Sequence, residues 1–221
     1  MRNVIRAVLV VFVLWVGIAA PVAARPPEDA VAARPLEDGL AAHGRGDYAT
    51  ALRLLRPLAE QGDASAQFNL GLMYDNGQGV PQDDAAALKW YRLAAEQGVA
   101  EAQTNLGTMY ATGQGVAQDY GAALRWSRLA AEQGHASAQH NLGVAYRYGQ
   151  EVPRDYAEAA RWFRLAAEQG DADAQYNLGV MYAIKASSGV ARLREFLGLG
   201  VPRDYIQAYK WFDLAASRFS A

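Results

Sequence analysis

Cysteine is absent from the 221 residues of this chain. Its absence excludes disulfide bonds, thiolate metal sites and a lipid anchor on a cysteine side chain. Without such links the fold depends on the burial of apolar side chains, and roughly 200 residues are enough to form a core that does this. We therefore expect the stability of the protein to come from packing.

Histidine is scarce, with three residues, and the motifs of the common enzyme classes are missing. His135 and His140 are five positions apart, whereas paired metal ligands on a helix are four apart. No Gly-x-Ser-x-Gly motif presents a nucleophilic serine, and no glycine-rich loop carries the Lys-Ser or Lys-Thr pair of a phosphate site. The sequence thus predicts no catalytic residue, no metal site and no cofactor. A hydrolase is the alternative from another functional class, and activity screens would test it.

Long apolar runs are also rare. Residues 7–20 form an uncharged run that is shorter than the roughly 20 residues that span a membrane. The run follows Arg2 and Arg6 and precedes small residues at 22–24, which is the pattern of a secretory signal peptide. We therefore expect residues 1–24 to be a signal peptide and the mature protein to be exported to the bacterial periplasm, with no stable membrane span. If the segment stays uncleaved, the protein would instead be a membrane-tethered envelope scaffold.

Basic side chains are not in excess. Apart from Arg2 and Arg6, the chain has 19 lysines and arginines against 23 acidic residues. Proteins that bind nucleic acids normally show a basic face. We therefore expect no nucleic-acid partner.

Prolines and charged residues are concentrated in residues 25–35. This composition disfavours a packed element, and we expect a flexible leader there. Leu36, Leu40 and Ala41 then follow a helical spacing. The folded domain is therefore predicted to extend over residues 36–221.

The most informative pattern is the string Ala-Glu-Gln-Gly, which recurs every 36 residues. Its glutamates are Glu60, Glu96, Glu132 and Glu168. A fixed period of this length is typical of stacked supersecondary units. Most of the chain is therefore one unit copied in series, and the positions that recur in every copy are expected to build the stack.

Each copy begins with the pattern Ala-Gln-x-Asn-Leu-Gly-x-x-Tyr. In the first full copy, Ala66, Leu70, Met73 and Tyr74 fall on one face of a helix. The glycine of the pattern lies in mid-helix, where it costs up to ~1 kcal/mol relative to alanine. Its recurrence predicts that a second helix approaches closely at these glycines. They are Gly71, Gly107, Gly143 and Gly179.

A loop with the pattern Gly-x-Gly-Val follows and ends the first helix, because paired glycines favour positive φ angles. In the third copy Glu151 replaces the second glycine, and we expect that loop to differ locally. An aspartate then caps the second helix of each copy. The expected caps are Asp83, Asp119, Asp155 and Asp204.

The second helix of each copy carries a tryptophan, followed by a pair of alanines. The tryptophans are Trp90, Trp126, Trp162 and Trp211. Large aromatic side chains next to small alanines are typical of an interlocked core, and a ladder of rings for ligand stacking is the alternative interpretation. We expect Trp126, with repeats on both sides, to contribute more to stability than Trp211 in the last copy.

Together these motifs resemble the Sel1-like repeat, a relative of the tetratricopeptide repeat with a longer loop between its two helices. The resemblance implies an all-α fold, a right-handed α-solenoid of about five antiparallel helix pairs. The units are expected at residues 36–62, 63–98, 99–134, 135–170 and 171–221. The first is degenerate, with Leu54 in place of tryptophan and Pro57 interrupting its second helix, and the last carries an insertion at 183–195. The resemblance also implies a non-catalytic module for protein–protein interaction, an adaptor whose concave face is lined by the first helices.

Residues that differ between copies are expected to face outward. On the first helices they recur at spacings of three and four, so they share one helical face, which we call the stripe. We predict that stacking turns the stripe into a groove that binds a peptide or helix of a protein partner. The candidate binding residues are Phe68, Leu72, Thr104, Thr108, His140, Val144, Arg147, Tyr148, Tyr176, Val180 and Ile184. Aromatic residues and arginine are common at interface hot spots, although Phe68 and Tyr176 could instead complete the packing between helices.

Two features at the C-terminal side have open interpretations. The insertion at 183–195 is either a partner-docking element or a neutral loop. The apolar end of the chain, including Phe219, is a candidate for self-association. The sequence does not identify the partner.

Overall fold

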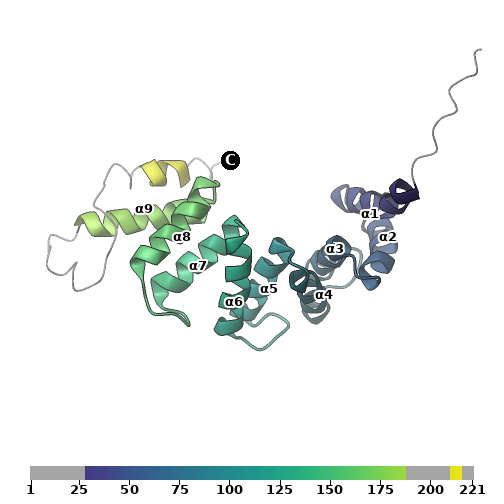
Figure 1. The fold of residues 1–221 in the computed structure, drawn as a ribbon, viewed down its shortest axis with the longest axis horizontal. Helices are drawn as coiled ribbons and strands as arrows, with labels where there is room; N and C mark the ends of the chain where they lie inside the picture. The colour runs from purple at the N-terminus through teal and green to yellow at the C-terminus, as the bar shows by residue number, and fades with distance from the viewer. Residues whose placement is uncertain (1–27, 188–209, 216–221) are drawn as a thin grey trace, which may run out of the picture. The chain divides into compact units, whose positions relative to one another are not determined.

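The computed structural model describes residues 28–187 and 210–215 (Figure 1). The chain divides into two compact units, Met1–Arg34 and Pro35–Ala221. The described residues are helical, without a strand. The helices are α1 (Glu28–Gly44), α2 (Tyr48–Glu60), α3 (Ala64–Asp75), α4 (Asp84–Glu96), α5 (Ala100–Thr112), α6 (Tyr120–Glu132), α7 (Ala136–Tyr148), α8 (Tyr156–Glu168) and α9 (Ala172–Ser187), and residues 210–215 are helical as well. The predicted signal peptide, residues 188–195 of the predicted insertion, Asp204 and Phe219 lie outside the described residues.

Two expectations about prolines are wrong. α1 begins at Glu28 and continues through Pro35, so the flexible leader predicted for 25–35 is helical from Glu28 onward. The alanines between the prolines have the highest helix propensity and offset the hydrogen bond that Pro35 removes. α2 also continues through Pro57. Pro57 lies on the exposed side of α2, where water can bond the carbonyl that loses its partner.

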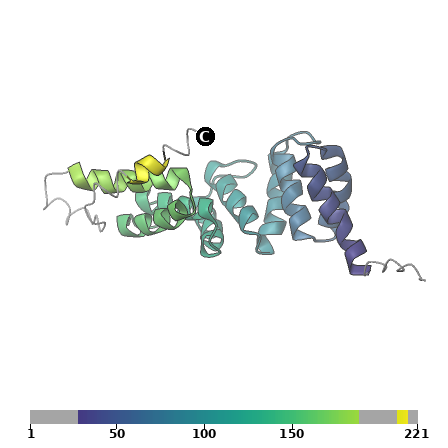
Figure 2. The ribbon, with the colours of Figure 1, turned by 90° about the horizontal axis from the view of Figure 1, so that it is seen from above.

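Consecutive helices pack against each other along the described array (Figure 1, Figure 2). The two helices of one copy pack most extensively, in the pairs α3–α4, α5–α6 and α7–α8. Each pair also packs on its neighbour through α4–α5, α6–α7 and α8–α9, and α7 touches α9 directly. The tandem helix pairs form an α-solenoid of about five units.

The space between the two helices of a copy is filled by the residue after the tryptophan. Tyr91 and Phe163 occupy this position, and both are fully buried. A Cβ atom on Gly71 would lie 2.4 Å from Cδ1 of Tyr91, and one on Gly143 would lie 2.5 Å from Cδ1 of Phe163. The glycines therefore make room for a ring, which confirms the close helix approach predicted from their recurrence.

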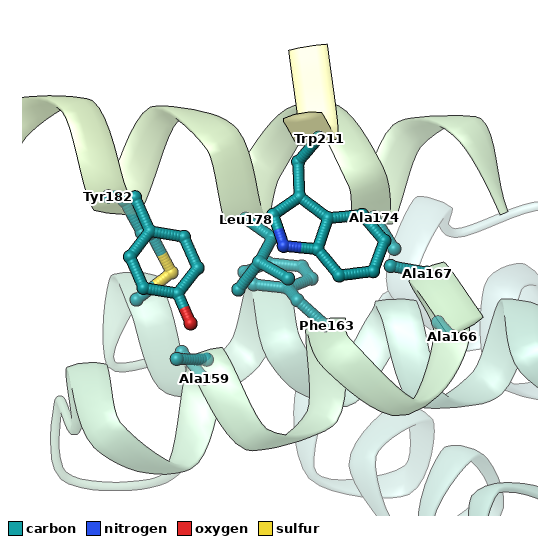
Figure 3. Close-up of a cluster of buried hydrophobic side chains, with 10 residues drawn as sticks. Ala159, Phe163, Ala166, Ala167, Ala174, Leu178, Tyr182 and Trp211 are labelled. Carbon is teal, nitrogen blue, oxygen red and sulfur yellow. The ribbon is translucent and has the colours of Figure 1, made fainter. Parts of the chain in front are cut away.

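The predicted order of burial of the tryptophans is wrong. Trp126 is only half-buried, whereas Trp211 is 8% exposed. Figure 3 shows Trp211 beside Leu178 and Ala174 of α9, with Phe163 in the same cluster. Each of these two tryptophans packs on a cluster that includes the preceding copy. The place of the copy in the array therefore does not set the order of their burial.

A ladder of glutamines explains the recurring Ala-Glu-Gln-Gly string. Gln67 is almost fully buried, and its Nε2 donates to the carbonyl of Ala59 at 3.0 Å. Its Oε1 accepts from Nε2 of Gln97, the glutamine of the next string, at 2.7 Å. The same pair of bonds recurs around Gln103 and around Gln139. Because buried amides are normally paired, both glutamines of these three copies are fixed by the stack.

The predicted caps of the second helices are confirmed where they are described. Asp83 accepts from the backbone N–H of Ala86 at 2.9 Å, and Asp119 accepts from that of Ala122 at 2.8 Å. Asp155 accepts from two backbone N–H groups at the start of α8. These bonds satisfy donors that would otherwise be free in the first turn.

The loop at Glu151 keeps the backbone of its glycine-containing equivalents, so the predicted local difference is wrong. Its φ angle is 56°, compared with 72° at Gly79 and 65° at Gly115. The loop is fixed on both sides, because the backbone N–H of Gln150 donates to Ala145 and that of Asp155 donates to Tyr146, as in the preceding copy. Glu151 is therefore held in a left-handed conformation that residues with a Cβ disfavour.

Replacing Glu151 with glycine is expected to raise the free energy of unfolding by about 0.5–1 kcal/mol. Relief of the left-handed conformation is worth roughly 1–2 kcal/mol, and the greater freedom of glycine in the unfolded chain offsets part of this. Denaturant titration would measure the change. Glu151→Ala is the control, since it removes the charge but keeps the Cβ. An equal gain in the alanine variant would contradict the conformational explanation.

Candidate functional site

The stripe is divided between exposed and packed side chains. Tyr148 at the end of α7 and Tyr176 on α9 are 55% and 52% exposed. Thr108 on α5 is also exposed. The half-buried members are Phe68, Leu72, His140, Val144, Arg147 and Val180. Ile184 lies in α9, but its side chain is outside the described part of the chain.

Phe68 and Leu72 belong partly to the stack. Both side chains pack against the cluster of α4 and α5 that contains Tyr91. The ring centroids of Phe68 and Tyr91 are 6.0 Å apart, within the range of interacting aromatic pairs. These two residues therefore hold neighbouring copies together and offer only part of their surface to a partner.

Thr104 does not belong to the partner-facing surface, contrary to the sequence prediction. It is 6% exposed. Its hydroxyl donates to the carbonyl of Ala100 at 2.8 Å and lies 3.0 Å from Nδ1 of His135. A threonine in mid-helix can bond the carbonyl four residues earlier, and here that bond turns the side chain toward the start of α7.

A polar network joins α7 and α9. Arg147 donates to Oδ1 of Asn177, and Nδ2 of Asn177 lies 3.2 Å from Nε2 of His140. The guanidinium of Arg147 also lies 5.2 Å from the ring of Tyr148, a cation–π distance. Sequence reasoning missed Asn177, because an asparagine recurs at this position in every copy and so was assigned to the stack. The network orients Arg147 and Tyr148 across the boundary between two copies.

The exposed part of the stripe is therefore concentrated on α7 and α9, two helices that touch. Its members are apolar, aromatic and cationic, and Val144 and Val180 on the same two helices are half-buried. Such a surface suits apolar contact and hydrogen bonding to another chain. It offers no pair of acid and base with a shared reactive position.

The hydroxyl of Tyr91 has a structural role between the helices of its copy. Burial raises the pKa of the Tyr91 hydroxyl, and the neighbouring Asp75 carboxylate raises it further. Tyr91 donates to Asp75 at 3.1 Å.

Within residues 28–187 and 210–215, no three His, Asp or Glu side chains gather closely enough to hold a metal ion. No helix in the same ranges is both long and apolar enough to cross a membrane.

The Sel1 repeat family matches residues 36–63, 64–99, 100–135, 136–171 and 172–218. The chain belongs to the Sel1 repeat family. Members of this family are generally protein–protein interaction modules. The matched segments cover the helix pairs described above, including the degenerate first copy.

Solved structures of other Sel1 repeat proteins resemble this chain. A Sel1 repeat protein from Oxalobacter formigenes is 42% identical, with a TM-score of 0.64, over 76% of this chain and 45% of the other. The protein c5321, a protective antigen of uropathogenic Escherichia coli with an SLR fold, is 37% identical, with a TM-score of 0.67, over 86% and 47%. The chain thus spans less than half the length of these two relatives. A putative Sel1 repeat protein from Klebsiella pneumoniae, 22% identical with a TM-score of 0.53 over 88% of this chain and 95% of the other, supports the fold alone. A comparison with curated proteins finds no match.

Proposed function

We propose that this Sel1 repeat protein is an exported adaptor or regulator that binds a peptide or helix of a protein partner through the stripe on α7 and α9. The observation that carries the proposal is the exposure of Tyr148 and Tyr176 on two helices that touch. About half of each side chain is exposed to water, and the ring of Tyr176 also lies 5.8 Å from that of Phe212. Residues of this kind dominate binding energy when a partner buries them.

The polar network adds a reason to place the partner here. His140 and Asn177 hold Arg147 near the ring of Tyr148 before any partner arrives. A side chain fixed in advance loses less conformational entropy on binding. The guanidinium can then donate to carbonyl or carboxylate groups of the bound chain.

Site-specific photo-crosslinking tests the proposal. A benzophenone amino acid replaces Tyr148 or Tyr176 in the full chain, expressed in the cells that make it. Exposed apolar residues on the second helices provide matched controls, and these are Leu129 on α6 and Leu165 on α8. We expect the two stripe positions to crosslink the same partner protein and the two control positions to crosslink it weakly. Crosslinking mainly from Leu129 and Leu165 would place the partner on the opposite helices.

A further inference from the structure

One copy lacks the ring that fills the space between its two helices. The position after the tryptophan is Tyr91, Phe163 or Phe212 in three copies, but it is Ser127 in the copy of α5 and α6. Here Gly107 faces the hydroxyl of Ser127, where its equivalents face a ring. A cavity of about 150 Å³ lies at this place, lined by Gly107 and Ser127.

A second position with a smaller side chain, in the following copy, lines the same cavity. Ala145 of α7 occupies the position that is Met73, Met109 and Met181 in the other copies. All three methionines are buried. The cavity therefore lies where two neighbouring copies have each lost a large apolar side chain. Such a loss destabilises a core, and its occurrence at one point in two copies is consistent with a vacancy that another group fills.

The cavity reaches the stripe. Thr108 and Val144, two of the predicted binding residues, line it together with Ala111 on the same helical face. A protein bound along the stripe therefore lies beside the cavity and can direct a side chain toward it. The size is suitable, because an engineered apolar cavity of about 150 Å³ in another protein holds one benzene molecule.

The lining also indicates which ring fits. In the first full copy the hydroxyl of Tyr91 donates to Asp75 at 3.1 Å. The equivalent of Asp75 in the copy with the cavity is Ala111, which offers no acceptor. A phenol in the orientation of Tyr91 would lose this carboxylate acceptor, which is unfavourable for a buried hydroxyl, so a phenyl ring suits this position better than a phenol. Asn141 and Gln150, which also line the cavity, can bond the peptide groups beside an entering residue.

We propose that this cavity receives a phenylalanine side chain of the partner protein, in the place of the ring that the copy lacks. The proposal rests on the proposed function, since the partner must lie along the stripe. It adds a specific anchor at Ser127, Ala145 and Ala111, beside Val144 of the stripe.

The test uses the purified protein with N-acetyl-phenylalaninamide, N-acetyl-tyrosinamide and benzene as probes, and it measures binding by NMR. Ser127→Phe fills the cavity from α6, and Ala145→Met fills it from α7. Ser65→Phe makes the same serine-to-phenylalanine change at an exposed position of α3, and it is the matched control for Ser127→Phe. We expect the phenylalanine amide and benzene to bind the wild type, and the tyrosine amide to bind more weakly. Each filling variant should weaken binding by about tenfold or more, whereas Ser65→Phe should leave it unchanged.

Three results would overturn the proposal. They are no binding of the phenylalanine amide to the wild type, equal binding of the tyrosine amide, and full binding to both filling variants. If one filling variant does not fold, the other gives the comparison. Benzene binding without binding of the amide would mean that the cavity is closed to a side chain from outside. Because no partner is present, a failure here is distinct from a failure of the crosslinking experiment.

Discussion

Replacing Phe163 with alanine is expected to lower the free energy of unfolding by about 3–5 kcal/mol. The ring is fully buried between α7 and α8, in a cluster that extends to Leu178 of α9 (Figure 3). Removing it takes away its burial and leaves a cavity that two rigid helices cannot close. Because the cluster joins two copies, the loss affects the packing within a copy and between copies.

The comparison that makes this result specific is Trp126→Ala. Trp126 is larger than Phe163 but only half-buried, so its truncation is expected to cost less. Tyr148→Ala is a control for removal of an exposed ring, with an expected change within about 0.5 kcal/mol. Denaturant titration of the three variants gives the order. If Trp126→Ala costs as much as Phe163→Ala, the half-buried tryptophan would contribute as much to the core as the buried ring, which would contradict this order.

Replacing Gly143 with alanine is expected to destabilise the fold by about 1–3 kcal/mol, the usual range for overpacking. The new Cβ would lie 2.5 Å from Cδ1 and 2.6 Å from Cε1 of Phe163. Real Cβ atoms do not approach so closely, and a buried ring cannot move aside as the tip of a flexible side chain can. The clash outweighs the gain of up to ~1 kcal/mol that alanine brings to a helix.

Two variants separate the clash from the change in helix propensity. Gly44→Ala places the same methyl group at a helical glycine with no atom within 4 Å of the new Cβ, and it should be neutral or stabilising. In the double variant Gly143→Ala with Phe163→Ala, the glycine substitution should cost much less than it does alone, because the ring it meets is absent. Additive costs would show that the two residues do not interact.

The repeated features of the fold were predictable from the sequence because they recur in register. Gln67 and Gln97 stand in the same relation as Gln103 and Gln133, so a shared structural role follows from the period. The caps at Asp83 and its equivalents follow from local chemistry in the same way. Neither inference depends on how the copies are oriented.

The order of burial was not predictable, because adjacent aromatic residues on one helix point only about 100° apart. Trp162 and Phe163 both lie near the core face, and periodicity does not rank them. The glycine opposite Phe163 decides the matter, and that contact crosses from α7 to α8. The helix from Glu28 through Pro35 was missed for a different reason. Composition alone does not show whether the helix propensity of three alanines outweighs the hydrogen bond that one proline removes.

The candidate site was predicted only in part. Variation between copies located Tyr148 and Tyr176 correctly on the surface, but it also selected Thr104, which bonds its own helix and faces His135. It omitted Asn177, a recurring residue that takes a second role between Arg147 and His140. Variation shows that the stack does not require a particular side chain, and it does not show where that side chain points.

The claim that α7 and α9 form the partner-binding surface is tested most directly by the yield of crosslinked partner at Tyr148 relative to Leu129. Both side chains are exposed, at 55% and 46%, so their access to a passing protein is similar. The account predicts that the partner is crosslinked predominantly from Tyr148. Equal yields at the two positions, or a higher yield at Leu129, would contradict it.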